Sequence, residues 1–146
     1  MAVSRGFAKF GELRTSLEGA SEDRLLDAYS LRDARRWASA VAMGIYSLEI
    51  RIKVLICLHL DLEQLPRAVQ FHELQDLLVL TGLSNRIKRE AGEVLAAWER
   101  IVRLSKQATD LRYSPGAEYS EAMATEFFDD LQDPVKGVLP WLSLAR

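Results

Sequence analysis

The feature that most limits how this chain can fold is a long apolar stretch from Ala34 to Leu60. Past its first turns, this stretch is interrupted mainly by Ser47, Glu49, Arg51 and Lys53. A helix that is hydrophobic on nearly every face has to be surrounded by its neighbours, because a surface helix carries only one apolar stripe. We therefore expect residues 34–60 to form a central helix around which the other helices pack.

The same stretch is long enough to raise the question of a membrane span. Glu49, Arg51 and Lys53 fall near its middle, and placing such charges in hydrocarbon costs about 2.5–3.5 kcal/mol for each Arg or Lys. We therefore expect no membrane association. The first residues lack the uninterrupted apolar segment of a secretory signal, and Cys57 is the single cysteine, which excludes a disulfide framework. These features together predict a cytoplasmic protein.

Length and composition predict one soluble globular domain over residues 1–146, with 49% apolar and 27% charged residues. The net charge is −2, so only a local basic patch would favour nucleic acid. We find neither a glycine-rich phosphate loop nor an HExxH motif, and the lone Cys57 rules out zinc-cysteine motifs, so we expect no metal and no cofactor. We interpret the acidic cluster Asp129, Asp130 and Asp133 as solvated charges.

Before the central stretch, the hydrophobic spacing from Ser4 to Leu17 predicts a helix that stops at Gly19. Ser21 then offers an N-cap for a short apolar segment, and the pattern leaves open whether this segment is a separate helix or a bent continuation. The run from Ser30 to Asp33 resembles a capping box and fits the start of the central helix.

After the central stretch, Pro66 marks an exit loop and three further helices follow. The first runs from Phe71 to near Gly82, the second is the amphipathic helix from Arg86 to Asp110, and the third is capped by Ser120 and ended by Asp133-Pro134. The tail is predicted to pack as a short turn. Because no strand-like alternation of useful length is present, the sequence predicts an all-α fold, an antiparallel bundle of about five helices around one long central apolar helix.

Several short motifs occur in a recognisable order along these helices. They are Ala42, Tyr46, Glu49 and Lys53 in the central helix, His72-Glu73-Leu74 at the start of the next helix, and Arg112-Tyr113-Ser114-Pro115 after the amphipathic helix. In order and spacing, over roughly Leu25 to Leu142, they resemble the HEPN (higher eukaryotes and prokaryotes nucleotide-binding) family of small helical bundles. The resemblance implies a homodimer, a protein partner such as a small nucleotidyltransferase in a toxin–antitoxin-type system, and contact with RNA or a nucleotide.

The resemblance also implies a possible chemistry, since many HEPN proteins are metal-independent ribonucleases built on Arg-x(4–6)-His. Such a site needs a His to move protons at the ribose 2′-OH and an Arg to stabilise the phosphorane charge. Arg112 matches the Arg, but no His follows it, because the only two are His59 and His72. The run from Arg67 to His72 has the spacing, outside the position where the family keeps its pair. We expect a non-catalytic binding module; the alternative is a divergent ribonuclease toxin that uses Arg112.

Candidate ligand-binding residues fall into two groups. The pair Glu49 and Lys53 is spaced i,i+4 in the favoured order, so it either marks a functional flank or only neutralises charge inside a crowded helix. A second, basic group would contact phosphates if its members converge, and would otherwise be a solvated face. Its members on and after the amphipathic helix are Arg100, Arg103, Lys106, Arg112 and Tyr113, and those near the start of the central helix are Arg32, Arg35 and Arg36.

Overall fold

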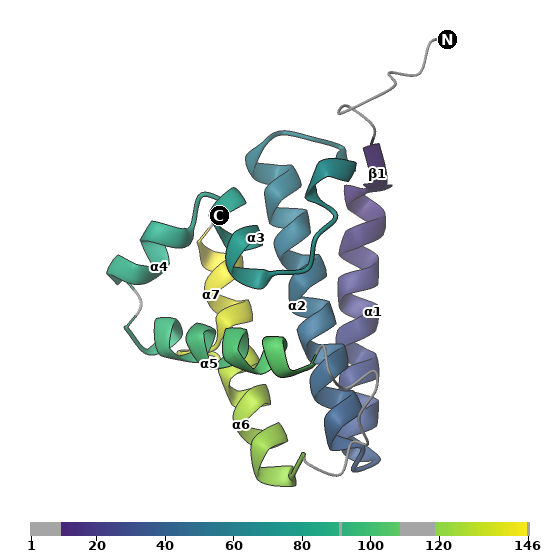
Figure 1. Ribbon diagram of the computed structural model, residues 1–146, viewed down its shortest axis with the longest axis vertical. Coiled ribbons are helices and arrows are strands. Elements are labelled where there is room, and N and C mark those ends of the chain that lie inside the picture. The colour runs from purple at the N-terminus through teal and green to yellow at the C-terminus, as the bar shows by residue number, and fades with distance from the viewer. Residues whose placement is uncertain (1–9, 91, 109–118, 146) are drawn as a thin grey trace.

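The computed structural model of the protein describes residues 10–90, 92–108 and 119–145. These residues form seven α-helices, a short 3₁₀ helix and one antiparallel pair of strands (Figure 1). The all-α class is confirmed, with more helices than the five that the sequence predicted. In chain order the elements are β1 (Phe10–Leu13), α1 (Arg14–Asp33), α2 (Trp37–His59), β2 (Gln64–Pro66), η1 (Arg67–Val69), α3 (Leu74–Leu80), α4 (Ser84–Glu90), α5 (Gly92–Ala108), α6 (Glu121–Gln132) and α7 (Val138–Leu144).

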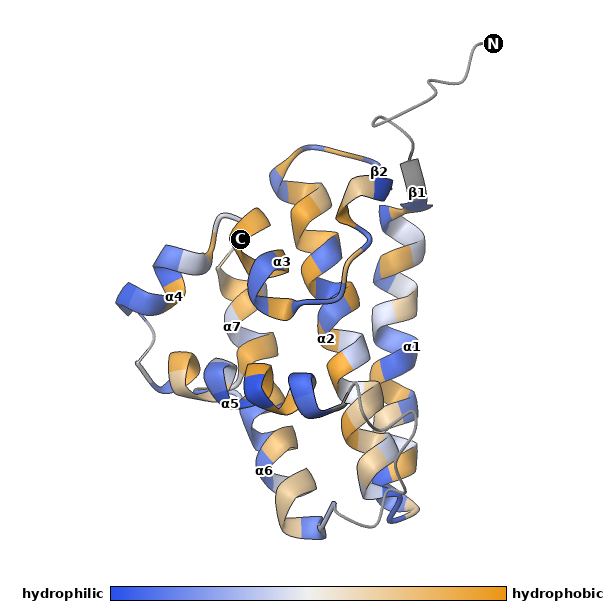
Figure 2. Ribbon diagram, viewed as in Figure 1, coloured by the Kyte–Doolittle hydropathy of each residue, from blue (hydrophilic) through white to orange (hydrophobic). Residues whose placement is uncertain are grey.

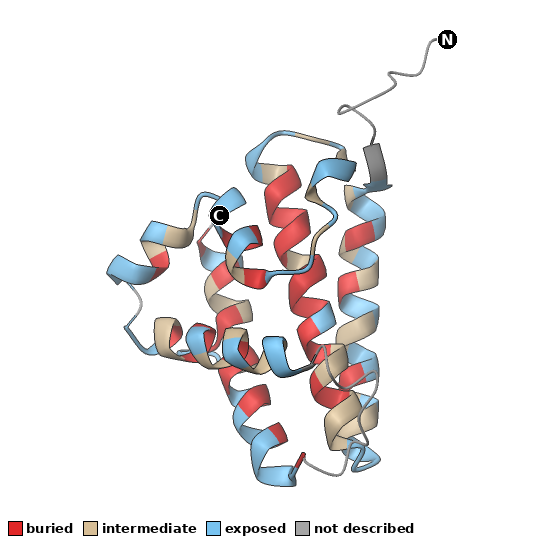
Figure 3. Cartoon of the chain, in the orientation of Figure 1, coloured by how far each residue is buried: buried red, intermediate tan, exposed pale blue. Residues whose placement is uncertain are grey.

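Helix α2 lies at the centre of the bundle, as the sequence predicted. It contacts α1, α3, α5 and α6, and Figures 1 and 3 show it flanked by other helices and buried along most of its length. Figure 2 shows apolar, orange segments along much of this helix. Between Trp37 and Leu58, Tyr46 is the one residue classed as exposed. Among the described residues, no helix combines the length and hydrophobicity needed to cross a bilayer.

Helix α1 differs from the prediction, because it is one unbroken helix where the sequence indicated a stop at Gly19 and a cap at Ser21. Both residues lie inside α1, while residues 10–13 form β1 and the start predicted at Ser4 lies outside the described residues. Ser21 is buried against α2, where its Oγ donates to the Ser47 carbonyl (3.2 Å) and the Ser47 Oγ donates to the Ser21 carbonyl (2.8 Å). This reciprocal contact offsets the cost of a glycine in a helix interior, about 1 kcal/mol.

The turn between α1 and α2 also lies later than predicted. The Arg36 N–H donates to the Leu31 carbonyl and the Arg35 N–H to the Arg32 carbonyl, both at 2.9 Å. With Arg35 at a φ of 59°, this is a Schellman motif. The run from Ser30 to Asp33 is therefore the last turn of α1 and not a capping box, and α2 begins at Trp37.

A short sheet joins the start of α1 to the loop after α2, and no pattern in the sequence predicts it. The strands β1 and β2 pair antiparallel, and the Arg14 N–H donates to the Glu63 carbonyl (2.7 Å). With strands of four and three residues, alternation is too short to recognise. Beneath the sheet lies a small apolar cluster of Leu17, Ile50, Val54, Cys57 and Leu65.

The second half of the chain matches the prediction in part. The helix predicted from Phe71 begins at Leu74. Within the helix predicted from Arg86 to Asp110, the structure gives α4 and α5, while Ala91 between them and the predicted end at Asp110 lie outside the described residues. The Ser120 cap is confirmed, since its Oγ accepts the Met123 N–H (3.2 Å). The tail forms the helix α7 where the sequence predicted only a turn.

The end of α6 at Asp133 is confirmed. The Asp133 carboxylate accepts the N–H groups of Val135 (2.9 Å) and Lys136 (3.0 Å). These two backbone hydrogen bonds lower the pKa of Asp133, because they favour its ionised form. The carboxylate therefore stabilises this turn above its usual pKa, and the contribution is lost as the pH falls through the lowered value.

The contact between Gly44 of α2 and the Phe127 ring of α6 provides a test of the packing. A Cβ atom on Gly44 would lie 2.5 Å from Cε2 and 2.8 Å from Cζ of Phe127, a ring that is 2% exposed. We expect Gly44→Ala to lower the free energy of unfolding by about 1–3 kcal/mol through overpacking, measured by urea denaturation. Gly19→Ala is the matched control, since nothing lies within 4 Å of its added Cβ, and it should gain up to about 1 kcal/mol. Equal effects at the two glycines would contradict this packing.

Candidate functional site

The candidate site lies on the face of α2 that the other helices leave partly open. Tyr46 is 47% exposed, and Glu49 and Lys53 follow it three and seven residues later, on the same side of the helix. Glu49 is only 6% exposed and Lys53 only 7%. The central helix therefore presents an aromatic ring to solvent and holds two opposite charges just beneath the surface.

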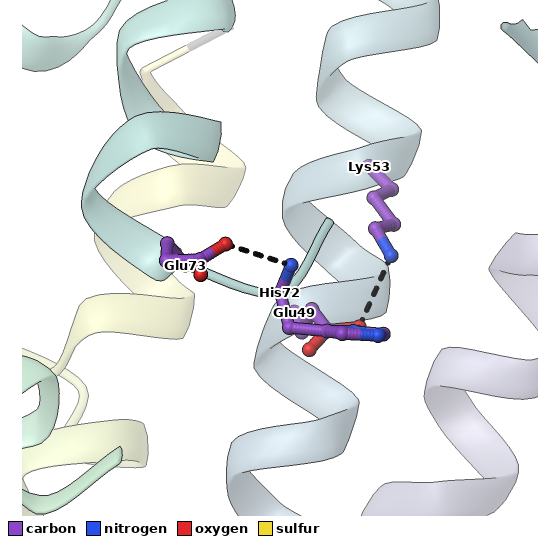
Figure 4. A network of polar contacts seen from close by, with 4 residues as sticks. All are labelled: Glu49, Lys53, His72 and Glu73. Carbon is purple, nitrogen blue, oxygen red and sulfur yellow. Dashed lines mark hydrogen bonds and ion pairs between the residues drawn. The ribbon is translucent and has the colours of Figure 1, made fainter. Parts of the chain in front are cut away.

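His72 completes a polar group that we call the Glu49 cluster (Glu49, Lys53 and His72; Figure 4). The Lys53 ammonium donates to Oε2 of Glu49 (3.1 Å), so the predicted pairing is confirmed, and Nδ1 of His72 lies 3.0 Å from the same oxygen. The His72 side chain is 67% exposed, whereas those of Glu49 and Lys53 are 8% and 9% exposed. One buried carboxylate oxygen thus binds a buried ammonium and an accessible imidazole.

The segment between η1 and α3 positions His72. Glu73 follows it directly, and the Glu73 carboxylate accepts the backbone N–H of His72 (3.2 Å). Leu74 then begins α3 and is buried. Glu73 therefore contacts only the backbone of His72, while the imidazole ring is oriented by the Glu49 carboxylate on α2.

The hydrogen bond to Glu49 fixes the chemistry of the imidazole. An ionised carboxylate only accepts hydrogen bonds, so Nδ1 of His72 carries the proton in this contact. In the neutral ring, Nε2 then holds the free lone pair, which can accept a hydrogen bond, take up a proton or act as a nucleophile. Lys53 balances the charge of Glu49, so the cluster offers an oriented imidazole and no large net charge.

Arg100 lies apart from this cluster and faces α6. Its Nε and Nη2 donate to the two carboxylate oxygens of Asp130 (2.9 and 2.7 Å), and Glu126 lies 3.7 Å away. The hydrogen bonds to Asp130 raise the pKa of Arg100. Asp130 is 7% exposed, so the interpretation of this residue as a solvated charge is wrong; it forms a bidentate pair that joins α5 to α6. Within the described residues, no hydrogen bond or ion pair links Arg100 to the Glu49 cluster.

The other predicted basic residues are distributed over different parts of the surface. Arg103 and Lys106 are exposed on α5 and form no ion pair with any residue that the structure describes. The Arg32 guanidinium lies over the rings of Tyr29 (4.9 Å) and Phe128 (5.0 Å), so it is engaged in packing. Arg35 and Arg36 are exposed at the turn between α1 and α2, while Arg112 and Tyr113 lie outside the described residues.

Two other features of the structure were weighed as candidate sites. A shallow depression between α5 and α6 is lined by more acidic than basic side chains, which does not suit a phosphate; its charged residues are Arg100, Lys136, Glu121, Glu126, Asp129 and Asp130. Within the described ranges, no group of three or more His, Cys, Asp or Glu residues is arranged to hold a metal ion.

Comparison with known proteins found no family model, no curated protein and no solved structure that matches this chain. The function therefore has to be inferred from the site itself. Sequence reasoning named Glu49 and Lys53 as candidates but left out Tyr46 and His72. The helical spacing of Tyr46 from Glu49 was an available signal, whereas the contact of His72 with a residue 23 positions away had none.

The burial of the ion pair can be tested by removing one charge and then both. Lys53→Met leaves the Glu49 carboxylate with only His72 beside it, and we expect it to lower the free energy of unfolding by about 2–4 kcal/mol. The double change Glu49→Leu with Lys53→Met should recover most of this loss, because no unpaired charge then stays buried. His72→Ala should cost below about 1 kcal/mol, since the ring is mostly exposed. Urea denaturation measures all three, and a single-variant loss no larger than that of His72→Ala would contradict the buried pair.

Proposed function

We propose that this protein is a non-catalytic, HEPN-like helical binding module that contacts RNA or a nucleotide at the open face of α2. The observation that carries the proposal is the Glu49 cluster beside the exposed ring of Tyr46. This arrangement combines an aromatic surface with an oriented hydrogen-bonding group, on a helix that the rest of the fold holds rigid.

Each part of the site has a counterpart in a nucleotide. An exposed tyrosine ring stacks on a base, and such stacking contributes about 1–3 kcal/mol per base. Nε2 of a neutral His72 accepts a hydrogen bond from a ribose hydroxyl or a base N–H. The cluster itself suits the nucleoside part better than the phosphate, because the charge of Lys53 is balanced by Glu49.

The phosphates require positive charge from elsewhere, and α5 supplies it. Helix α5 packs against α2, and Figure 1 shows its C-terminal part beside the central helix. Arg103 and Lys106 are exposed on that part of α5. Their charges are available for phosphate contacts, which release counterions and make binding depend on salt.

The proposal includes assembly as a homodimer or with a protein partner such as a small nucleotidyltransferase of a toxin–antitoxin-type system, as the HEPN resemblance implies. Support from the fold is limited to exposed apolar side chains. Val79 (55% exposed) and Leu80 (36%) are neighbours on α3, and Leu144 at the end of α7 is 83% exposed. Large apolar groups on a surface favour contact with another protein.

Binding of a labelled single-stranded RNA tests the ligand, measured by fluorescence anisotropy over a series of salt concentrations. Tyr46→Ala should weaken binding by about fivefold to 150-fold, the loss of one stacked base. Arg103→Ala and Lys106→Ala should each lower the slope of log affinity against log salt by about 0.7, the value for one phosphate on a single strand. His59→Ala is the control, since His59 is an exposed residue at the C-terminal end of α2, 13 positions after Tyr46. An RNA affinity that changes neither in Tyr46→Ala nor with salt concentration would refute the proposed site.

The assembly state is a separate prediction. A two-fold dimer would bury the same patch on both chains, so we expect sedimentation velocity at micromolar concentration to give the mass of two chains. A sample that is strictly monomeric across that range would remove the homodimer from the proposal and leave the ligand site untouched.

A divergent ribonuclease is the second candidate, and one observation favours it. A carboxylate-oriented imidazole such as His72 can act as a general base, the role that the missing His after Arg112 would otherwise take. The same RNA distinguishes the two candidates. Under the leading proposal it stays intact, whereas cleavage that disappears in both Arg112→Ala and His72→Ala would establish the enzyme.

A further inference from the structure

The two histidines of the chain have very different surroundings. His72 is 67% exposed, and its Nδ1 lies 3.0 Å from a carboxylate oxygen of Glu49. His59 is also exposed, but its ring lies over Gly82, and the structure gives it no hydrogen bond to any described residue. The Glu49 carboxylate therefore orients the imidazole of His72. The imidazole of His59 has no such partner among the described residues, so it provides an internal reference.

We propose that His72 is a phosphoryl-acceptor residue, modified at Nε2 by a small activated phosphoryl donor of the acyl phosphate or phosphoramidate class. Nε2 attacks the phosphorus with its lone pair, and an Nε2–P bond forms. The bond from phosphorus to the leaving group breaks, and its electron pair leaves with the carboxylate or with ammonia. Neither partner is oxidised or reduced, and the His72 proton stays on Nδ1.

The geometry stabilises the positive charge that this step creates on the His72 ring. As Nε2 bonds to phosphorus, the imidazole ring becomes positive, and the Glu49 carboxylate at Nδ1 stabilises that charge. Glu49 is held in place by Lys53 at 3.1 Å, so it need not reorganise during the reaction.

Accessibility favours the same residue. Two thirds of the His72 side chain surface is open to solvent, so a small donor reaches Nε2 without any opening of the bundle. The modification does not require RNA binding, and the two proposals can fail independently.

The experiment treats the full chain with potassium phosphoramidate and, separately, with acetyl phosphate. Intact-mass and peptide mass spectrometry follow the addition of phosphoryl groups, and nuclear magnetic resonance assigns the modified ring nitrogen. We expect His72 to be modified at least about tenfold faster than His59, because only one of them has an orienting carboxylate. We also expect the phosphoryl group on Nε2, since Nδ1 is engaged by Glu49.

Two carboxylate variants separate the proposed role from a structural one. Glu49→Gln should slow modification of His72 by about tenfold while leaving the rate at His59 unchanged, because the amide does not balance a positive ring. Glu73→Gln is the matched control, since Glu73 contacts the backbone N–H of His72 and not its ring; it should keep the full rate. Equal rates at the two histidines, modification at Nδ1, or a Glu49→Gln rate equal to wild type would each overturn the proposal.

Discussion

The whole bundle depends on the need to remove α2 from water on nearly every side. Its apolar residues follow no single stripe, so one neighbouring helix is not enough, and α1, α3, α5 and α6 all pack on it. Two of these contacts involve small residues of α2. The reciprocal Ser21–Ser47 hydrogen bonds join α1 to α2, and Gly44 leaves room for the Phe127 ring of α6. Small residues on α2 thus decide how near its neighbours lie.

The cover is incomplete at Tyr46, which is 47% exposed, and the candidate site lies at this opening. Glu49 and Lys53 are buried at a cost in solvation, and their ion pair at 3.1 Å offsets part of that cost. A carboxylate in this position has little freedom to move. It can therefore orient an exposed side chain from another segment, which is the relation between Glu49 and His72. The packing that makes the helix central therefore also buries the carboxylate that orients His72.

The parts of this structure that sequence could predict are those set by local chemistry. The central helix, the Ser120 cap, the stop at Asp133 and the Glu49–Lys53 pair all follow from residues within a few positions of each other. The parts it missed depend on distant residues. Gly19 and Ser21 read as a helix boundary until the contact with Ser47 is known, and Asp130 reads as solvated until Arg100, 30 positions away, is placed beside it. His72 belongs to the same class, since its partner Glu49 lies on another helix.

The pairing of Arg100 also changes how the basic face of α5 is understood. A linear pattern counts Arg100, Arg103 and Lys106 as equivalent, but a guanidinium that binds both oxygens of Asp130 has already satisfied its charge. Only Arg103 and Lys106 then offer free positive charge on the described part of this helix. Helix α5 also packs against α2, so the same helix carries the ion pair to α6 and the two exposed cations. On the described part of α5, these two exposed residues, and not Arg100, are therefore the ones whose charge is left to bind an anion.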